Sequence, residues 1–320
     1  MSGMQIIVIH ADGLQVAALG PYGNEWIATP NLNRLATQAV VFDQHFADTP
    51  GIADPGLERE LVEEHVIDFL LPPWLPPAEL LAEQFEDWEF EAEAQPWLDP
   101  QPGFLDPADE QAFSQLQRTY SAVVRQFDAE VGKILERLPD DALLILTARR
   151  GQNLGEHGLI GDHRPWLHEE FTHLPLFIRL PGSAEGGRRI AHLTRSADVA
   201  ATIHDALGRP FDGPGRSLLP MCHGGPGIRP YVATILHGDG VAEFALQSAR
   251  EKIILPQGDP SRSAMYFVKP DDRWEVNDLR QSNLDRAEAL ERTLLEYVEA
   301  SRVPGLWQIP SLPELTLSET

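Results

Sequence analysis

Residues 5–50 read QIIVIHADGLQVAALGPYGNEWIATPNLNRLATQAVVFDQHFADTP, and this stretch decides the fold class. Residues 5–10 form a continuous apolar, β-branched run, which is typical of a strand buried on both faces of a parallel sheet. Thr29 and Pro30 then provide a cap and a first-turn proline for an amphipathic helix. Residues 40–42 predict a second short strand, so strand and helix alternate from the start.

The same alternation continues along the chain. Residues 106–138 carry apolar side chains at helical three-and-four spacing, and this is the strongest periodic segment. Two more buried strands are predicted at 142–147 and 174–180, followed by a helix that Ser196 caps and Gly208 ends. This pattern predicts an α/β fold with a central, mostly parallel sheet and helices on both faces.

The sequence pattern changes beyond residue 225, where it predicts short strands joined by Gly, Pro and Asp turns. A final amphipathic helix is predicted from about 283 to 300. We therefore divide the chain into an α/β core at 1–225 and a small C-terminal antiparallel sheet-and-helix subdomain at 226–320. The strands expected in that subdomain are 231–236, 243–246, 252–255 and 264–268.

Charge is distributed unevenly. The chain has 49 acidic and 25 basic residues, a formal charge of −24, and residues 57–110 alone contain 16 carboxylates against one arginine. This balance argues against nucleic acid or an anionic membrane as a partner. Proline pairs and three tryptophans in 57–110 predict an excursion over the surface, anchored by aromatics and solvated by charge. The functional alternative is a lid or an interaction arm.

Cys222 is the single cysteine, which excludes an intrachain disulfide framework and a cysteine-rich zinc site. No apolar run approaches the length of a membrane span, and the first residues lack the basic region of a signal peptide. We expect a cytoplasmic protein.

Several blocks together resemble the sulfatase family of the alkaline-phosphatase superfamily. They are residues 7–50, YSAVVRQFDAEVGKILERL at 120–138, GQNLGEHGLIGDHRPWLHEEFTHLPLFIRLPG at 151–182, and GRSLLP at 215–220. The resemblance implies the sulfatase fold and hydrolysis of sulfate, phosphate or phosphonate esters. It also implies a formylglycine nucleophile, a divalent cation that is usually calcium, and Lys, Arg and His side chains that stabilise negative charge.

The position that matches the family's nucleophile holds Ile52. Isoleucine has no heteroatom to attack an ester and cannot be oxidised to formylglycine. Thr49 is a weak substitute, since its unactivated hydroxyl would need a shift of the loop. The catalytic nucleophile is therefore unknown.

The metal-binding positions have also changed. Asp12 matches a strand-end ligand, but Gly13 replaces its usual aspartate neighbour, and Arg149 and Arg150 stand where the family has Asp and His. Arginine offers no lone pair, so we expect no bound metal; two arginines do bring the charge of a divalent cation. We predict that Arg149 or Arg150 forms an ion pair with Asp12 in place of metal coordination, with a single pairing favoured.

Two further positions match the family near its pocket. Asp162 stands where a lysine is expected, and His157 lies in the GEHG segment. No HxxxH or HExxH spacing is present, so we expect His157 and its neighbouring histidines to form structural hydrogen bonds. We call Asp12, Gly13, Arg149, Arg150, His157 and Asp162 the ancestral pocket.

These substitutions predict a catalytically inactive sulfatase-like protein with a binding or scaffolding role and no cofactor. The expected partner is another protein or a small anion such as sulfate or phosphate. The alternative is an active sulfuric or phosphoric ester hydrolase with an atypical nucleophile or metal site, which would then require calcium. A third interpretation is a binder of small anions or sulfated glycans that uses the old pocket.

Overall fold

The computed structural model describes residues 4–52, 59–90, 93–161, 166–238, 240–302 and 310–313. A seven-stranded sheet forms the core, with strand order β10-β2-β9-β5-β1-β3 and with β8 paired to β2. Its strands are β1 (Ile6–Ala11), β2 (Val40–Phe46), β3 (Glu63–Ile67), β5 (Leu143–Thr147), β8 (His173–Leu174), β9 (Leu176–Arg179) and β10 (Arg189–Arg195). The pairs β1–β3, β1–β5 and β2–β10 are parallel, whereas β9 runs antiparallel to β2 and β5. The predicted α/β fold with a central, mostly parallel sheet is confirmed.

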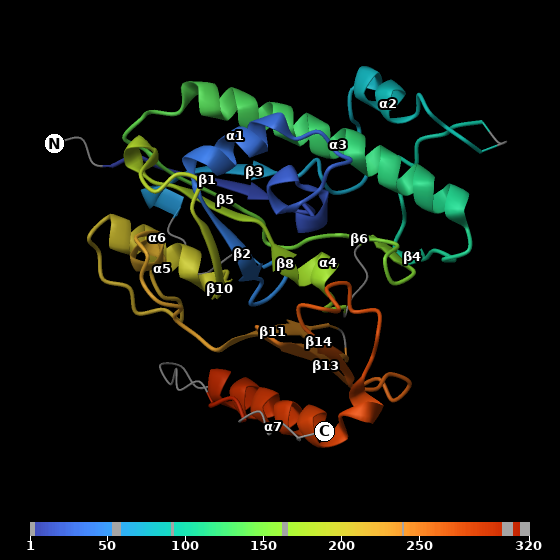
Figure 1. The fold of residues 1–320 in the computed structure, drawn as a ribbon, viewed down its shortest axis with the longest axis vertical. Coiled ribbons are helices and arrows are strands. Elements are labelled where there is room, and N and C mark those ends of the chain that lie inside the picture. Colours follow the sequence, from blue (N-terminus) through green and yellow to red (C-terminus); the bar gives the residue numbers. More distant parts are fainter. Residues whose placement is uncertain are drawn as a thin grey trace.

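Helices cover both faces of this sheet (Figure 1). One face carries α1 (Pro30–Gln38) and α3 (Glu110–Arg137), and the other carries α5 (Ala197–Ala206) and α6 (Leu219–Cys222). Side chains of β1 alternate between the two faces: Ile7 and Ile9 join the apolar cluster under α1 and α3, while Ile6 and Val8 join the cluster under α5. The continuous apolar run at the N-terminus is thus explained by burial on two sides.

The prediction that the side chains of Thr29 and Ser196 cap the helices that follow them is wrong. The Thr29 side chain caps nothing in α1, because its hydroxyl accepts a hydrogen bond from the Gly20 backbone at 3.0 Å. Asp128 of α3 instead accepts from two first-turn N–H groups of α1, at 3.1 and 2.8 Å. Ser196 likewise makes no side-chain cap, and Asp48 accepts the first N–H of α5 at 2.8 Å. Both N-termini are capped by residues distant in the sequence.

The acidic segment 57–110 is only partly a surface excursion. Its β3 adds an edge strand to the central sheet, which the sequence analysis did not foresee. Trp74 is fully buried, with its indole N–H donating to the Leu70 carbonyl at 2.8 Å and its ring 5.6 Å from that of Tyr120. Beyond it, α2 (Ala78–Gln84) lies against α3, and β4 (Gly103–Phe104) pairs with β7 (Leu159–Gly161), which also pairs with β6 (Asn153–Leu154). Aromatic anchoring was predicted correctly, whereas the sheet contribution was missed.

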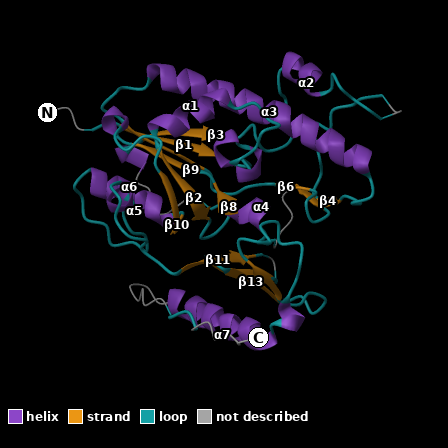
Figure 2. Cartoon of the chain, in the orientation of Figure 1, coloured by secondary structure: helices purple, strands orange, loops and turns teal. Residues whose placement is uncertain are grey.

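The C-terminal residues form a four-stranded antiparallel sheet with one long helix against it (Figure 2). The elements are β11 (Tyr231–His237), β12 (Ala242–Ser248), β13 (Glu251–Gln257), β14 (Met265–Val268) and α7 (Leu284–Ser301). Phe267 of this sheet shares an apolar cluster with Phe171 of α4 (Glu169–Thr172), and the Ile235 backbone donates to the Asp48 carbonyl at 2.9 Å. The predicted subdomain is present, while its boundary at 225/226 stays a prediction. No helix in the described part of the chain combines the length and apolarity that crossing a membrane requires.

Candidate functional site

The carboxyl ends of β1 and β5 bring together four residues of the ancestral pocket. These strands are parallel neighbours with His10 opposite Thr147, so Asp12 and Arg149 meet at the same edge of the sheet. Asp12 is buried, with 6% of its surface exposed. A buried carboxylate at this edge requires a counter-charge or several donors.

Arg149 supplies both. Its backbone N–H donates to Asp12 Oδ1 at 2.9 Å, its Nε donates to Oδ2 at 2.7 Å, and its terminal nitrogen forms an ion pair with the same oxygen. The hydrogen bonds from Arg149 to Asp12 raise the pKa of the guanidinium above its usual value. The ion pair predicted across the strand ends is therefore present, with Arg149 as the partner.

Arg150 contributes differently. Its guanidinium lies over the ring of Phe171, 5.7 Å from the ring centroid, and its carbonyl accepts from the Gly13 backbone at 3.0 Å. Gly13 has φ +90°, and a Cβ built there would lie 2.6 Å from Leu71 Cδ2 and 3.0 Å from Gln152 Oε1. The aspartate that the family carries at this position has no room in this structure.

The nucleophile position carries no reactive group. Ile52 is 58% exposed, and its backbone N–H donates to the Thr49 carbonyl at 3.2 Å. The side chains of Ile52, His10, His45, Thr147 and Arg149 contribute to a cavity of only about 20 Å³, enough for a single water molecule. Asp162 lies outside the described residues.

The calcium ion that the resemblance implies does not fit this set of residues. Both oxygens of Asp12 already accept hydrogen bonds from Arg149, and a guanidinium cannot coordinate a cation. Calcium needs six to eight oxygen ligands, and Gly13 and Ile52 offer no side-chain oxygen. Arg149 instead supplies one positive charge beside Asp12.

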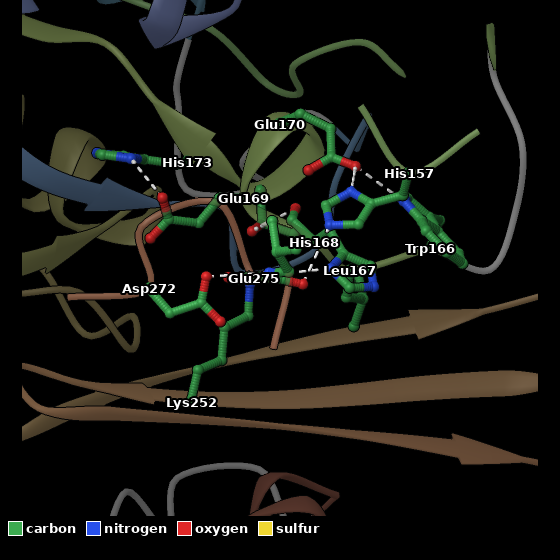
Figure 3. Close-up of polar contacts among 12 residues, drawn as sticks. His157, Trp166, Leu167, His168, Glu169, Glu170, His173, Lys252, Asp272 and Glu275 are labelled. Carbon is green, nitrogen blue, oxygen red and sulfur yellow. Dashed lines mark hydrogen bonds and ion pairs between the residues drawn. The ribbon is translucent and has the colours of Figure 1, made fainter. Parts of the chain in front are cut away.

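His157 belongs to a separate polar network between the core and the C-terminal sheet (Figure 3). Its Nδ1 lies 2.8 Å from Glu170 Oε1, and its Nε2 lies 3.2 Å from the Glu275 carbonyl. His168 Nδ1 lies 2.8 Å from Glu275 Oε2, and the indole of Trp166 donates to Glu170 at 3.0 Å. Burial acts to lower the pKa of His157, but the hydrogen bond with Glu170 and the charges of Glu170 and Glu275 together outweigh it, and the pKa lies above its usual value.

Two buried lysines complete this network. Lys252 Nζ lies 2.7 Å from Glu275 Oε1, and Lys269 Nζ lies 3.0 Å from the same oxygen and 3.1 Å from Glu169. Burial opposes ionisation of Glu275, yet the lysines and His168 hold its pKa well below its usual range. The expected hydrogen-bonding role of these histidines is present, but the clustering of His157, His168 and Glu170 was missed because their partners come from distant segments.

A cavity of about 600 Å³ adjoins this network and was not foreseen either. Trp26 and Trp274, each about half exposed, line it together with Arg273 and Glu156. Glu156 accepts from Gln15 Nε2 at 2.7 Å, and burial, with a smaller contribution from Glu170, raises the pKa of Glu156 to about 7. The volume is typical of small-molecule pockets.

Comparisons of sequence place the chain near the sulfatases. The sulfatase family model matches residues 79–209. N-acetylglucosamine-6-O-sulfatase of Bacteroides thetaiotaomicron is 33% identical over 116 residues, which cover 34% of this chain and 20% of that protein. The multifunctional alkaline phosphatase superfamily protein PehA of Trinickia caryophylli is 32% identical over 121 residues, covering 35% and 23%. The match therefore spans about a fifth of the length of these curated relatives.

Solved structures with the same fold cover nearly the whole chain. The putative sulfatase yidJ from Bacteroides fragilis has a TM-score of 0.75 at 14% identity and covers 96% of this chain and 97% of its own. Phosphonate monoester hydrolase of Agrobacterium radiobacter has a TM-score of 0.69 at 16% identity, with 94% and 96% covered. At these identities the likeness shows the fold alone. Together with the family match, it confirms the resemblance expected from the sequence.

Proposed function

We propose that this chain, which matches the sulfatase family model over residues 79–209 and shares the sulfatase fold, is a catalytically inactive relative with a binding or scaffolding role. One observation carries the proposal: Arg149 donates a hydrogen bond to each oxygen of Asp12 and places its guanidinium charge beside this one clear surviving metal-ligand position. Formylglycine-and-calcium chemistry then has neither its cation nor its nucleophile.

The nucleophile position supports the same conclusion. Ile52 cannot form a covalent intermediate, and double displacement on an ester requires one. Thr49 is half-buried, and its carbonyl accepts a hydrogen bond from the Ile52 backbone N–H. A threonine hydroxyl needs an adjacent base or a metal to attack at neutral pH.

A binding role is supported by what the molecule offers in place of that chemistry. The cavity at the strand ends has room for about one water molecule, which disfavours sulfate or phosphate at the old pocket. The cavity beside Trp26 and Trp274 is about thirty times larger and combines aromatic faces with a few polar groups. This larger cavity is therefore the candidate location for the binding role.

The test is turnover of 4-nitrophenyl sulfate, phosphate and phosphonate esters, with and without added Ca²⁺ or Mn²⁺. We expect no metal-dependent rate above the buffer, and no difference between the wild type and Asp12→Ala. A metal-dependent rate that Asp12→Ala abolishes would overturn the proposal and favour an active hydrolase with an atypical metal site. A thermal-shift screen with sulfate, phosphate and sulfated sugars tests retained anion binding.

A further inference from the structure

Three potential metal ligands converge away from the ancestral metal position. His157 lies between β6 and β7, while His168 and Glu170 lie at the start of α4. One ligand atom from each of them lies within 4.8 Å of the other two. The side chains of His168 and Glu170 are 2% and 6% exposed, and that of His157 is 15% exposed. Such a group is compact enough for one ion to bridge after a small adjustment.

Glu275 orients both histidine rings. Its carbonyl lies 3.2 Å from His157 Nε2, and its carboxylate lies 2.8 Å from His168 Nδ1. Each ring therefore has one nitrogen facing Glu275 and one nitrogen left for another ligand. This is the arrangement that metal-binding histidines show, where a carboxylate or carbonyl holds the second ring nitrogen.

The nitrogens left over are His157 Nδ1 and His168 Nε2. His157 Nδ1 lies 2.8 Å from Glu170 Oε1. His168 Nε2 is buried and has no hydrogen-bond partner among the described residues, and the 2.8 Å contact of Nδ1 with Glu275 Oε2 is an ion-pair contact without hydrogen-bond geometry. An unsatisfied buried polar atom costs free energy, and coordination of a metal ion would satisfy it.

The donor set determines which ion it suits. Two imidazole nitrogens and one carboxylate oxygen match the ligand preferences of Zn²⁺ and are too few and too nitrogen-rich for Ca²⁺. The indole of Trp166 holds Glu170 Oε1 at 3.0 Å and fixes the carboxylate against the rings. Three protein ligands leave a fourth position for water or an exogenous group.

We propose that His157, His168 and Glu170 bind one Zn²⁺ ion, at a site separate from the Asp12–Arg149 ion pair. Coordination replaces the hydrogen bond between His157 and Glu170, and it releases the proton that these two groups share. All three ligands belong to the α/β core, and Glu275 of the C-terminal subdomain contacts both histidine rings without being a ligand.

The experiment is zinc titration of the full chain, stripped with a chelator, in competition with a chromophoric zinc indicator. We expect one tight equivalent in the wild type. His168→Phe keeps the aromatic contacts of the ring and should weaken zinc binding at least 100-fold, more than the roughly 10–100-fold cost of losing an outer-sphere partner. His173→Phe is the matched control, because His173 stacks on Phe46 and is not one of the three ligands. It should leave zinc affinity unchanged.

X-ray absorption at the zinc edge of the wild type provides a readout that needs no variant. We expect two imidazole nitrogens and one carboxylate oxygen at about 2.0–2.2 Å. Zinc bound no more tightly by the wild type than by His168→Phe, or a spectrum without imidazole scattering, would overturn the proposal. The zinc titration measures binding and the hydrolysis assay measures turnover that depends on Asp12, so failure of the zinc site and failure of the proposed function are distinguishable.

Discussion

Replacement of Arg149 by methionine removes the partner of Asp12 while keeping most of the aliphatic stem. The Asp12 carboxylate would then retain the backbone N–H of residue 149 as its remaining donor from this pair. Removing one partner of a fully buried ion pair costs about 3–5 kcal/mol. Because 23% of the Arg149 side chain is exposed, solvent screening reduces this, and we expect about 2–3 kcal/mol.

The assay is urea unfolding at pH 7, with the free energy of unfolding compared between the wild type and Arg149→Met. The double variant Asp12→Asn/Arg149→Met removes the uncompensated charge and should recover about 1 kcal/mol or more, which gives a coupling energy between the two sites. Arg188→Met is the control, because Arg188 pairs with Glu185 on the surface, and its loss should cost under about 1 kcal/mol. If Arg149→Met costs no more than Arg188→Met, Asp12 does not depend on Arg149 and the reasoning is refuted.

Three further predictions concern backbone strain, pH and thiol reactivity. Gly13→Ala should lower the free energy of unfolding by about 1–3 kcal/mol, because it combines φ +90° with a Cβ 2.6 Å from Leu71 Cδ2; Gly23→Ala, at φ +99° with nothing within 4 Å, should cost only about 1 kcal/mol in the same urea assay, and equal losses would contradict the clash. Burial lowers the pKa of His45 to about 3. Below pH 6.5 the unfolded chain therefore takes up a proton at His45 that the folded chain refuses, and stability falls by up to about 1.4 kcal/mol per pH unit between pH 6.5 and 3. Urea unfolding at pH 7 and pH 5 should show a loss about 2 kcal/mol smaller in His45→Gln, whereas identical losses would mean that His45 is protonated in the folded state. Burial raises the pKa of the Cys222 thiol to about 12, so iodoacetamide at pH 8 should leave the native protein unmodified and label it in urea; rapid native labelling would contradict its burial.

Local sequence pattern was sufficient for the elements with continuous or periodic apolar runs, but it did not predict β10 (Arg189–Arg195), which pairs with β2. The apolar run at 5–10 predicted β1 because both faces of that strand are buried. The three-and-four spacing at 106–138 predicted α3 because one side of that helix is buried. The C-terminal strands and helix were found for the same reason. The edge strand β3 was missed because its sequence, EEHVI, is largely exposed and carries no apolar run. The caps predicted from neighbouring residues for α1 and α5 were wrong, because Asp128 and Asp48, which are distant in the sequence, accept the hydrogen bonds of the first N–H groups.

Some contacts of the candidate site could be predicted from the sequence, and others could not. The pairing of Asp12 with Arg149 or Arg150 could be predicted because the family resemblance placed these residues at metal-ligand positions, and the register of β1 and β5 identifies Arg149 as the partner. His157, His168 and Glu275 could not, since the third partner comes from beyond β14 and Glu275 sits at φ +57°, a conformation that no local pattern indicated. The cavity beside Trp26 and Trp274 joins residues about 250 positions apart, which sequence spacing cannot reveal.

Isothermal titration with Ca²⁺ tests most directly the claim that Arg149 has replaced the metal. The account predicts that the wild type takes up no Ca²⁺ at micromolar affinity, and that Asp12→Asn gives the same trace. One equivalent of Ca²⁺ bound at micromolar affinity by the wild type and lost in Asp12→Asn would contradict it.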